Sequence, residues 1–380
     1  MLLPGLLGSR LTLAGRSIWG TLRDFYRPHE RGAHLGLPHD ATSWGPVESP
    51  GVIEHIPIVP FVYALPVYNH LIDWLTKNRG YQLGRTLFPF GYDFRRDTVT
   101  LVRDLARFVE EVGRRAVASE VVLVGHSHGG ILASYLARFG TQDRLGSAGL
   151  PASAEPARTV KIRGVIAIGT AFRGALDNLR MMLDGYRPAP LGFHFGPAFH
   201  VLARSAVETL PAPGRCCFRD IGGNDAGVDI YDRRAWTRHG LGIFDSRVRQ
   251  TLPEGQFEAL ARVLQEGLQR GAKLHAAFAE PLAADAPPHR VIGATRTPTR
   301  VSGLLLDVPG VQRWSFDVRY FDGSPHYARG DGEVDAASLS GWRGPELGPV
   351  REVPGTHRVL INQPATWTAV GEELAALEAA

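Results

Sequence analysis

A serine in a glycine-flanked turn is the residue of this chain best placed for chemistry. An apolar, mostly β-branched run, Val121–Val124, is followed by Gly125-x-Ser127-x-Gly129, and residues 131–139 then read as a helix. A buried strand, a sharp turn and a helix in this order form an elbow that presents a nucleophilic serine. Glycines suit the turn because larger side chains would collide with the strand and the helix. The competing interpretation is an ordinary strand-to-helix turn with an exposed serine.

A serine nucleophile requires an imidazole that accepts its proton and a carboxylate that orients the imidazole. On an elbow of this kind the acid and then the base follow the serine along the chain. We predict Asp331, in a turn bounded by glycines, as the acid and His357 as the base. Asp335 is the alternative acid, although it could equally cap a helix. His326 is a weaker candidate base because it precedes the acid.

Two backbone N–H groups are predicted to form the oxyanion hole. One belongs to His128, the residue after the nucleophile, and the other to the glycine-rich turn at residues 4–11. Within that turn Leu6 is the first candidate and Leu7 the second, whereas a simple strand-ending turn is the competing interpretation. The turn lacks the Gly-Lys-Ser/Thr ending of a phosphate-binding loop. The side chain of His128 is too close in sequence to fold back onto the serine hydroxyl.

The rest of the chain alternates between helical and strand patterns. Helices are predicted at 69–79, from Asp97 or Thr98 to about 118, at 254–278 and at 363–378, and strands at 85–90, 160–170 and 290–294, with a hairpin at 314–321. This alternation predicts a mostly parallel central sheet flanked by helices, the α/β-hydrolase fold, with an inserted cap or lid region.

Changes in composition suggest three segments. Residues 1–174 are predicted to form the first part of the hydrolase core, with an excursion at about 28–66 that is rich in Pro, Gly and His. Residues 175–289 interrupt the alternation with turns and aromatic residues and are predicted to form the cap. Residues 290–380 are predicted to complete the core and carry the acid and histidine loops.

The composition excludes several classes of protein. Of the 380 residues, 44% are hydrophobic and 21% charged, which is typical of a globular chain with a large core. A net charge of +4 is too small to indicate nucleic-acid binding. We predict no cofactor, and the histidines show no metal-ligand spacing, so no metal is predicted. The two cysteines, Cys216 and Cys217, are adjacent and are expected to be reduced.

The sequence contains no apolar run of the length that a membrane span requires and no secretion signal at its start. The expected location is therefore the cytoplasm. Secretion stays open, because the chain begins only a few residues before the predicted oxyanion loop, and a longer native N-terminus would have room for a signal.

Several motifs together resemble the lecithin:cholesterol acyltransferase-like family, and more narrowly its bacterial members. Residues 4–9 are similar to that family's Pro-Gly-x-x-Gly-Ser/Asn loop and residues 89–95 to its Pro-Tyr-Asp-Trp-Arg segment. Residues 125–127 match its nucleophile, and residues 169–174 resemble its Gly-Ala/Thr-Pro-x-x-Gly loop. The acid and histidine loops follow in the same order. The resemblance implies a serine acyl-enzyme route on ester lipids, with Asp93 and Arg95 as a structural ion pair.

The chain departs from the family at several positions. His128 stands where relatives usually carry Leu or Met, Ala171 replaces a proline, and Glu333 replaces a threonine in the acid loop. No cysteine occurs before Cys216, whereas secreted relatives carry a disulfide in the lid region. These departures keep the predicted triad but bear on the substrate class.

The predicted function is a lipid O-acyltransferase or phospholipase that transfers a fatty acyl group from an ester lipid to an alcohol or to water. The expected partner is an ester lipid or another acyl ester, with at most a transient contact with a membrane or lipid-aggregate surface. The first alternative is a soluble carboxylesterase or thioesterase, and the second is a non-catalytic binding protein with a hydrolase fold.

Overall fold

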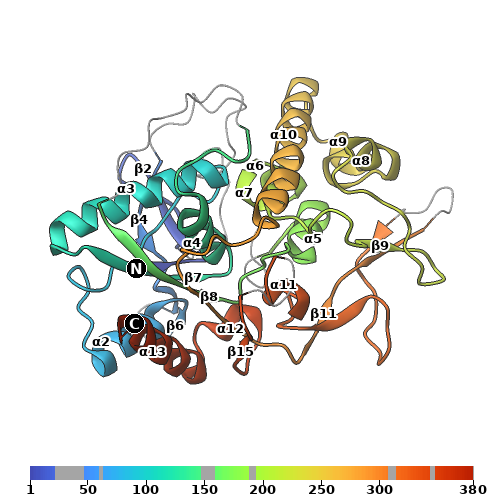
Figure 1. Cartoon of the computed structure of the whole chain (residues 1–380). Coiled ribbons are helices and arrows are strands. Elements are labelled where there is room, and N and C mark those ends of the chain that lie inside the picture. The colour runs from blue at the N-terminus through green and yellow to red at the C-terminus, as the bar shows by residue number, and fades with distance from the viewer. Residues whose placement is uncertain are drawn as a thin grey trace.

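A computed structural model describes residues 1–21, 47–59, 63–146, 159–187, 194–306, 314–342 and 347–379 (Figure 1). The predicted excursion at 28–66 therefore lies partly outside the described residues. Its described part contains β4 (Val47–Val52), β5 (His55–Val59) and β6 (Tyr63–Pro66). β4 pairs with β2 (Ser9–Leu13), which also pairs with β3 (Arg16–Trp19), while β5 pairs with β6.

A parallel sheet of five strands forms the centre of the molecule. Its spatial order is β1 (Leu2–Leu3), β7 (Glu120–His126), β8 (Lys161–Ile168), β10 (His289–Gly293) and β15 (Arg351–Glu352). All four neighbouring pairs run parallel. Helices cover the sheet on both faces, as is required of an all-parallel sheet. The predicted α/β-hydrolase fold is confirmed.

The alternation of side chains along β8 assigns the two faces. Val165 and Ala167 belong to one hydrophobic cluster, and Ile166 and Ile168 belong to another on the opposite face. Successive residues of a strand point to opposite faces, so the continuous apolar run of β8 is buried on both sides. α3 (Thr98–Ala116) and α4 (His128–Phe139) contribute to the first cluster, and α2 (Asn69–Arg79) and α13 (Pro364–Ala379) to the second.

The helix ends follow local sequence signals. Asp97 precedes α3, and its carboxylate accepts a hydrogen bond from the N–H of Thr100, as an N-cap side chain should. Gly80 ends α2 in the left-handed conformation, where a residue with a side chain would be strained. The predicted helices at 69–79, 254–278 and 363–378 match the structure to within a residue or two.

Two sequence predictions were wrong. Residues 85–90 do not form a strand, although Pro89 makes an isolated parallel bridge with Leu2. The bridge consists of the bonds from Leu2 N–H to the Phe88 carbonyl and from Phe90 N–H to the Leu2 carbonyl. Because β1 is only two residues long, the pairing does not extend into a ladder. Residues 314–321 do not form their own hairpin: only β13 (Trp314–Ser315) is extended, and it pairs with β12 (Gly303–Leu305), whose other neighbour is β9 (Phe218–Arg219). Residues 314–315 therefore pair with a strand just upstream of the predicted hairpin and not with residues 316–321.

The segment predicted as a cap is mainly helical and lies on the right of Figure 1. It has its own hydrophobic cluster. Its elements are α5 (Leu176–Asp184), α6 (Pro197–Leu202), α7 (Arg204–Glu208), β9, α8 (Arg233–His239), η3 (Gly242–Phe244), α9 (Ser246–Arg249) and α10 (Glu254–Phe278). Trp314 and Phe316, which lie beyond the predicted boundary at 289, pack in the same cluster. The predicted segment boundaries stay a prediction.

A buried ion-pair network joins this segment to the core. Arg270 of α10 contacts Asp97 at 2.8 Å and also pairs with Glu208 of α7. Glu208 is fully buried and accepts a hydrogen bond of 2.8 Å from the backbone N–H of Thr98. The start of α3 is thereby fastened to α7 and α10.

The remaining elements carry the C-terminal loops. β11 (Thr297–Arg300) pairs antiparallel with β14 (Tyr327–Gly330), and two short helices follow, α11 (Ala336–Leu339) and α12 (His357–Leu360). Across the described ranges, no helix has the length and hydropathy that a transmembrane span would need.

Candidate active site

Ser127 sits between the end of β7 and the start of α4 in a strained backbone conformation. Its φ of 51° and ψ of −119° are uncommon for a residue with a side chain. The Ser127 N–H is bonded to the carbonyl of Ile168 on the next strand at 2.8 Å, which anchors the turn to the sheet. This is the geometry of a nucleophile elbow.

Two glycines make the tight turn sterically feasible. A Cβ on Gly125 would come within 2.5 Å of the backbone of Gly129, because strand and helix cross there. A Cβ on Gly129 would come within 2.5 Å of the carbonyl oxygen of Pro4. The elbow and the glycine-rich turn near the N-terminus are therefore in backbone contact.

The structure brings Ser127, His357 and Asp331 together. The Oγ of Ser127 lies 3.0 Å from Nε2 of His357, and Nδ1 of the same ring lies 2.7 Å from Oδ2 of Asp331. Asp331 is fully buried, and its other oxygen accepts backbone N–H bonds from Glu333 and Val334 at 3.0 and 2.7 Å. A further backbone bond of 2.8 Å, from the N–H of His357 to the carbonyl of Asp331, joins the acid loop to the base loop. The catalytic role of the three stays a prediction.

The alternative acid and base lie elsewhere. Asp335 accepts a hydrogen bond from the N–H of Ser338 at the start of α11 and forms an ion pair of 2.7 Å with Arg215. His326 is paired with the hydroxyl of Ser302 at 3.1 Å. Each residue thus has partners that fit a structural role.

The electrostatics of the acid and base are coupled. Burial of His357 opposes its protonation, but the charge of Asp331 and the hydrogen bond between the two outweigh this and raise the pKa of His357 to about 9. Burial of Asp331 acts to raise its pKa, but His357 and the two backbone N–H bonds lower it overall. The carboxylate therefore stays charged and holds a proton on Nδ1 of His357, so that Nε2 faces the serine.

The glycine-rich turn has the features of an oxyanion loop. A hydrogen bond of 3.0 Å from Gly8 N–H to Gly5 carbonyl closes the turn, and Leu7 has a φ of 66°. The N–H groups of the two central residues, Leu6 and Leu7, are not used by such a turn's own bond. His128 occupies the first turn of α4, where helical N–H groups have no partner within the helix. Both predicted donors line the cavity that contains Ser127.

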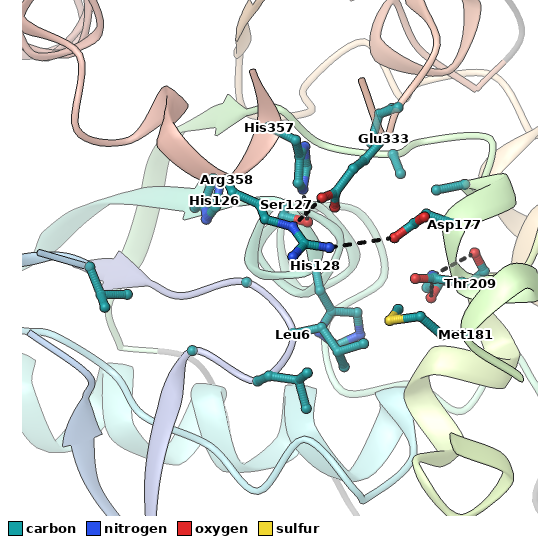
Figure 2. A pocket seen from close by; sticks show the side chains of 18 of the residues that line it. Leu6, His126, Ser127, His128, Asp177, Met181, Thr209, Glu333, His357 and Arg358 are labelled. Atoms are coloured by element: carbon teal, nitrogen blue, oxygen red, sulfur yellow. Dashed lines mark hydrogen bonds and ion pairs between the residues drawn. The ribbon is translucent and has the colours of Figure 1, made fainter. Parts of the chain in front are cut away.

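A cavity of about 460 Å³ opens at Ser127. Figure 2 shows Ser127 between His357 on one side and Leu6 and His128 on the other, with Met181 of α5 facing the same space. Apolar side chains form a large part of the lining, among them Leu6, Leu7, Trp19, Ile131 and Met181. An apolar cavity beside a nucleophile suits an acyl chain.

A charged cluster also lines the cavity. Arg358, which follows His357, pairs with Glu333 and donates a 3.1 Å hydrogen bond to the hydroxyl of Tyr186. Its guanidinium also lies 4.0 Å from the carboxylate of Asp177 (Figure 2). Glu333, one of the departures from the family pattern, thus links the acid loop to the residue beside the base.

Other sequence predictions can be placed as well. Asp93 and Arg95 form a buried ion pair of 2.7 Å, as the family resemblance implied. Cys216 and Cys217 are both free thiols. In the part of the chain that the structure describes, no three His, Cys, Asp or Glu side chains are arranged to hold a metal ion.

Tyr68 and Asp177 were not predicted from the sequence, and Tyr92 was included only within the motif at residues 89–95. Tyr68 has no sequence signal of its own, because it follows an irregular proline-containing stretch. Asp177 resembles any acidic residue in the first turn of a helix. Only the tertiary structure brings them to the nucleophile.

Comparison with known proteins finds one matching family model. Residues 63–190 match the family model described as lecithin:cholesterol acyltransferase. The chain is therefore similar to this family over less than half of its length. The match includes the nucleophile elbow and ends well before Asp331 and His357. The match supports an enzyme that transfers or hydrolyses acyl groups.

One solved structure supports the fold of this chain. A chain in the crystal structure of the Tle4–Tli4 complex is 13% identical, with a TM-score of 0.52, and the alignment covers 99% of this chain and 98% of that one. A Vlm2 thioesterase domain bound with a dodecadepsipeptide is 14% identical over 72% of this chain and 75% of that one, but its TM-score is only 0.25. No match was found among curated proteins.

Proposed function

We propose that this enzyme forms an acyl-enzyme at Ser127 and transfers the acyl group of an ester lipid to an alcohol or to water. The observation that carries the proposal is the hydrogen-bonded series from Ser127 through His357 to Asp331 at the edge of a largely apolar cavity. In this mechanism His357 accepts the serine proton as Oγ attacks the ester carbonyl, and it then protonates the departing alkoxide. The N–H groups of Leu6 and His128 stabilise the oxyanion.

The second half-reaction regenerates the serine. His357 accepts a proton from water or from an acceptor alcohol, whose oxygen attacks the acyl-enzyme carbonyl, and returns the proton to Ser127 Oγ as that bond breaks. Hydrolysis and transfer therefore differ only in which hydroxyl reaches the acyl-enzyme. The polar side of the cavity, with Glu333 and Arg358, would meet the part of the substrate that carries this hydroxyl.

Covalent labelling tests the nucleophile. A fluorophosphonate should label the wild-type enzyme but not the Ser127→Ala variant. Absence of labelling in both proteins would contradict the proposal and favour a non-catalytic binding protein.

Product analysis tests the substrate class. Incubation with dispersed phospholipid should release lysophospholipid with free fatty acid, and added alcohols should divert part of the acyl group into new esters. Labelling at Ser127 without cleavage of long-chain lipid, combined with rapid hydrolysis of short-chain soluble esters or thioesters, would favour the carboxylesterase or thioesterase alternative.

A further inference from the structure

The peptide group between Pro4 and Gly5 is held at both of its polar ends by buried tyrosines. The hydroxyl of Tyr92 donates to the carbonyl oxygen of Pro4 at 2.9 Å. The hydroxyl of Tyr68 accepts from the N–H of Gly5 at 2.7 Å. Both tyrosines are only 2% exposed, so water does not compete for these bonds.

Each tyrosine also binds one of the two histidines that flank the nucleophile. The Tyr68 hydroxyl lies 2.8 Å from Nδ1 of His126, and the Tyr92 hydroxyl lies 2.9 Å from Nδ1 of His128. Both histidines are buried. The two residues next to Ser127 are thereby connected, through one tyrosine each, to a single peptide group of the oxyanion loop.

The donor inventory of these groups fixes opposite tautomers for the two histidines. Tyr68 accepts the Gly5 N–H and so uses its own proton to donate to a bare Nδ1 of His126. Tyr92 uses its proton on the Pro4 carbonyl, so it must accept an N–H from Nδ1 of His128. Both series therefore run in one direction, in which each hydrogen bond strengthens the next.

The tautomers require neutral rings, and burial provides them. Burial lowers the pKa of His126 to about 3 and that of His128 to about 4. Both rings stay neutral near pH 7, so the two series keep their directions under ordinary conditions.

The Pro4–Gly5 peptide group, which the two tyrosines hold, directly precedes Leu6. The carbonyl of Gly5 accepts from Gly8 N–H, and the carbonyl of Leu7 accepts a 2.9 Å bond from the indole of Trp19. The turn also touches the nucleophile, because a Cβ on Gly5 would lie 3.1 Å from Cβ of Ser127. With the plane of the Pro4–Gly5 peptide fixed, the direction of the next N–H is restricted to a narrow range.

We propose that the pairs Tyr68–His126 and Tyr92–His128 are positioning residues that aim the Leu6 N–H at the oxyanion formed on Ser127. This inference rests on the proposed acyl-enzyme function and assigns a role to His128, which stands where relatives usually carry Leu or Met. In this proposal the four side chains act through the Pro4–Gly5 peptide, and their hydrogen bonds described above go to that peptide and to one another.

A comparison of an ester with its thionoester, in which sulfur replaces the carbonyl oxygen, separates two effects of a substitution. One is a change in the direction of the Leu6 N–H, and the other is a loss of folded enzyme. A donor placed for an oxyanion stabilises the larger sulfur anion poorly, so the wild-type enzyme should prefer the oxygen ester strongly. Tyr68→Phe and Tyr92→Phe should each lower kcat on the oxygen ester by roughly 10-fold with little change in KM. The oxygen-to-sulfur ratio of kcat/KM should fall by a similar factor, whereas a loss of folded enzyme would lower both rates equally.

Tyr135→Phe is the matched control. Tyr135 is a buried tyrosine of α4 whose hydroxyl donates to the carbonyl of Gln142 at 2.8 Å, away from the oxyanion loop. The Tyr135→Phe variant should keep the wild-type oxygen-to-sulfur ratio of kcat/KM even if the substitution lowers the midpoint of unfolding. An unchanged ratio in folded Tyr68→Phe and Tyr92→Phe would overturn the proposal.

Two substitutions of His128 provide an independent test where a tyrosine variant does not fold. His128→Asn keeps an N–H that can donate to Tyr92, and His128→Leu does not. His128→Leu should lower the ratio as Tyr92→Phe does, and His128→Asn should retain most of it. Equal ratios in Leu, Asn and wild-type proteins would contradict the positioning role.

The outcomes separate this inference from the proposed function. If the wild-type protein neither cleaves esters nor is labelled by a fluorophosphonate, the acyl-enzyme mechanism itself is refuted. The positioning role alone would be refuted if the wild-type enzyme is active, Ser127→Ala is inactive, and the tyrosine and histidine variants keep the wild-type oxygen-to-sulfur ratio of kcat/KM.

Discussion

Replacing Asp331 with asparagine should reverse the tautomer of His357, so that the ring can no longer act as a base toward Ser127. One oxygen of Asp331 accepts the backbone N–H groups of Glu333 and Val334, and the other faces Nδ1 of His357 at 2.7 Å. An asparagine would keep its oxygen on the two N–H groups and place its NH₂ against the imidazole. The ring would then present a bare Nδ1 to the amide and carry its proton on Nε2, where it cannot accept the proton of Ser127.

The size of the effect follows from the pair's electrostatics. The rise in the pKa of His357 from 6.5 to about 9 corresponds to roughly 3 kcal/mol of preferential stabilisation of the charged ring. Asp331→Asn removes that stabilisation, so the pKa of His357 should fall well below 9. Because the tautomer is also wrong, kcat should fall by about 10⁴-fold.

The assay is the pH dependence of kcat/KM on a soluble chromogenic ester. The neutral ring is the base, so the wild-type value should rise with pH, with a midpoint above 6.5 and near 9. Asp335→Asn is the matched control, because Asp335 is a buried carboxylate bound to Arg215 outside the triad. A wild-type midpoint at or below 6.5, or a greater loss of kcat in Asp335→Asn than in Asp331→Asn, would refute the assignment.

Further substitutions test the packing that supports the site. Gly129→Ala should destabilise the fold by about 1–3 kcal/mol in urea denaturation, because its Cβ would collide with the carbonyl of Pro4. The control Gly255→Ala has open space at its Cβ and should stay within about 1 kcal/mol of wild type. Equal effects of the two substitutions would contradict the close contact at Gly129. Arg270→Met should cost about 3–5 kcal/mol, because it leaves the buried carboxylate of Glu208 without its cation. A loss below about 1 kcal/mol would mean that this network does not hold the cap segment to the core.

The nucleophile and its fold could be predicted from sequence because their signals are local. Four apolar residues, two glycines around a serine and a helix pattern lie within about twenty positions of one another. The steric requirement at Gly125 and Gly129 is imposed by neighbours in the same strand–turn–helix unit and by Pro4. Strand-to-helix alternation then predicts the parallel sheet, because parallel strands require crossovers of this length.

Asp331 and His357 could be predicted only as an ordered pair. The order of acid and base along the chain selected them, but the choice against Asp335 and His326 depended on which side chains meet in space. The backbone bond from His357 to Asp331 and the ion pair from Asp335 to Arg215 join residues that no sequence pattern links.

The setting of the nucleophile was decided by tertiary structure alone. From sequence, His128 was a departure from the family with no assigned partner, and Tyr68 was unremarked. The hydrogen bonds that connect Tyr68 and His128 to the oxyanion loop and the elbow join residues 36 to 88 positions apart along the chain. Local sequence determines a turn's shape, because its steric demands act between neighbours, but the direction of its N–H groups depends on buried side chains contributed by distant elements.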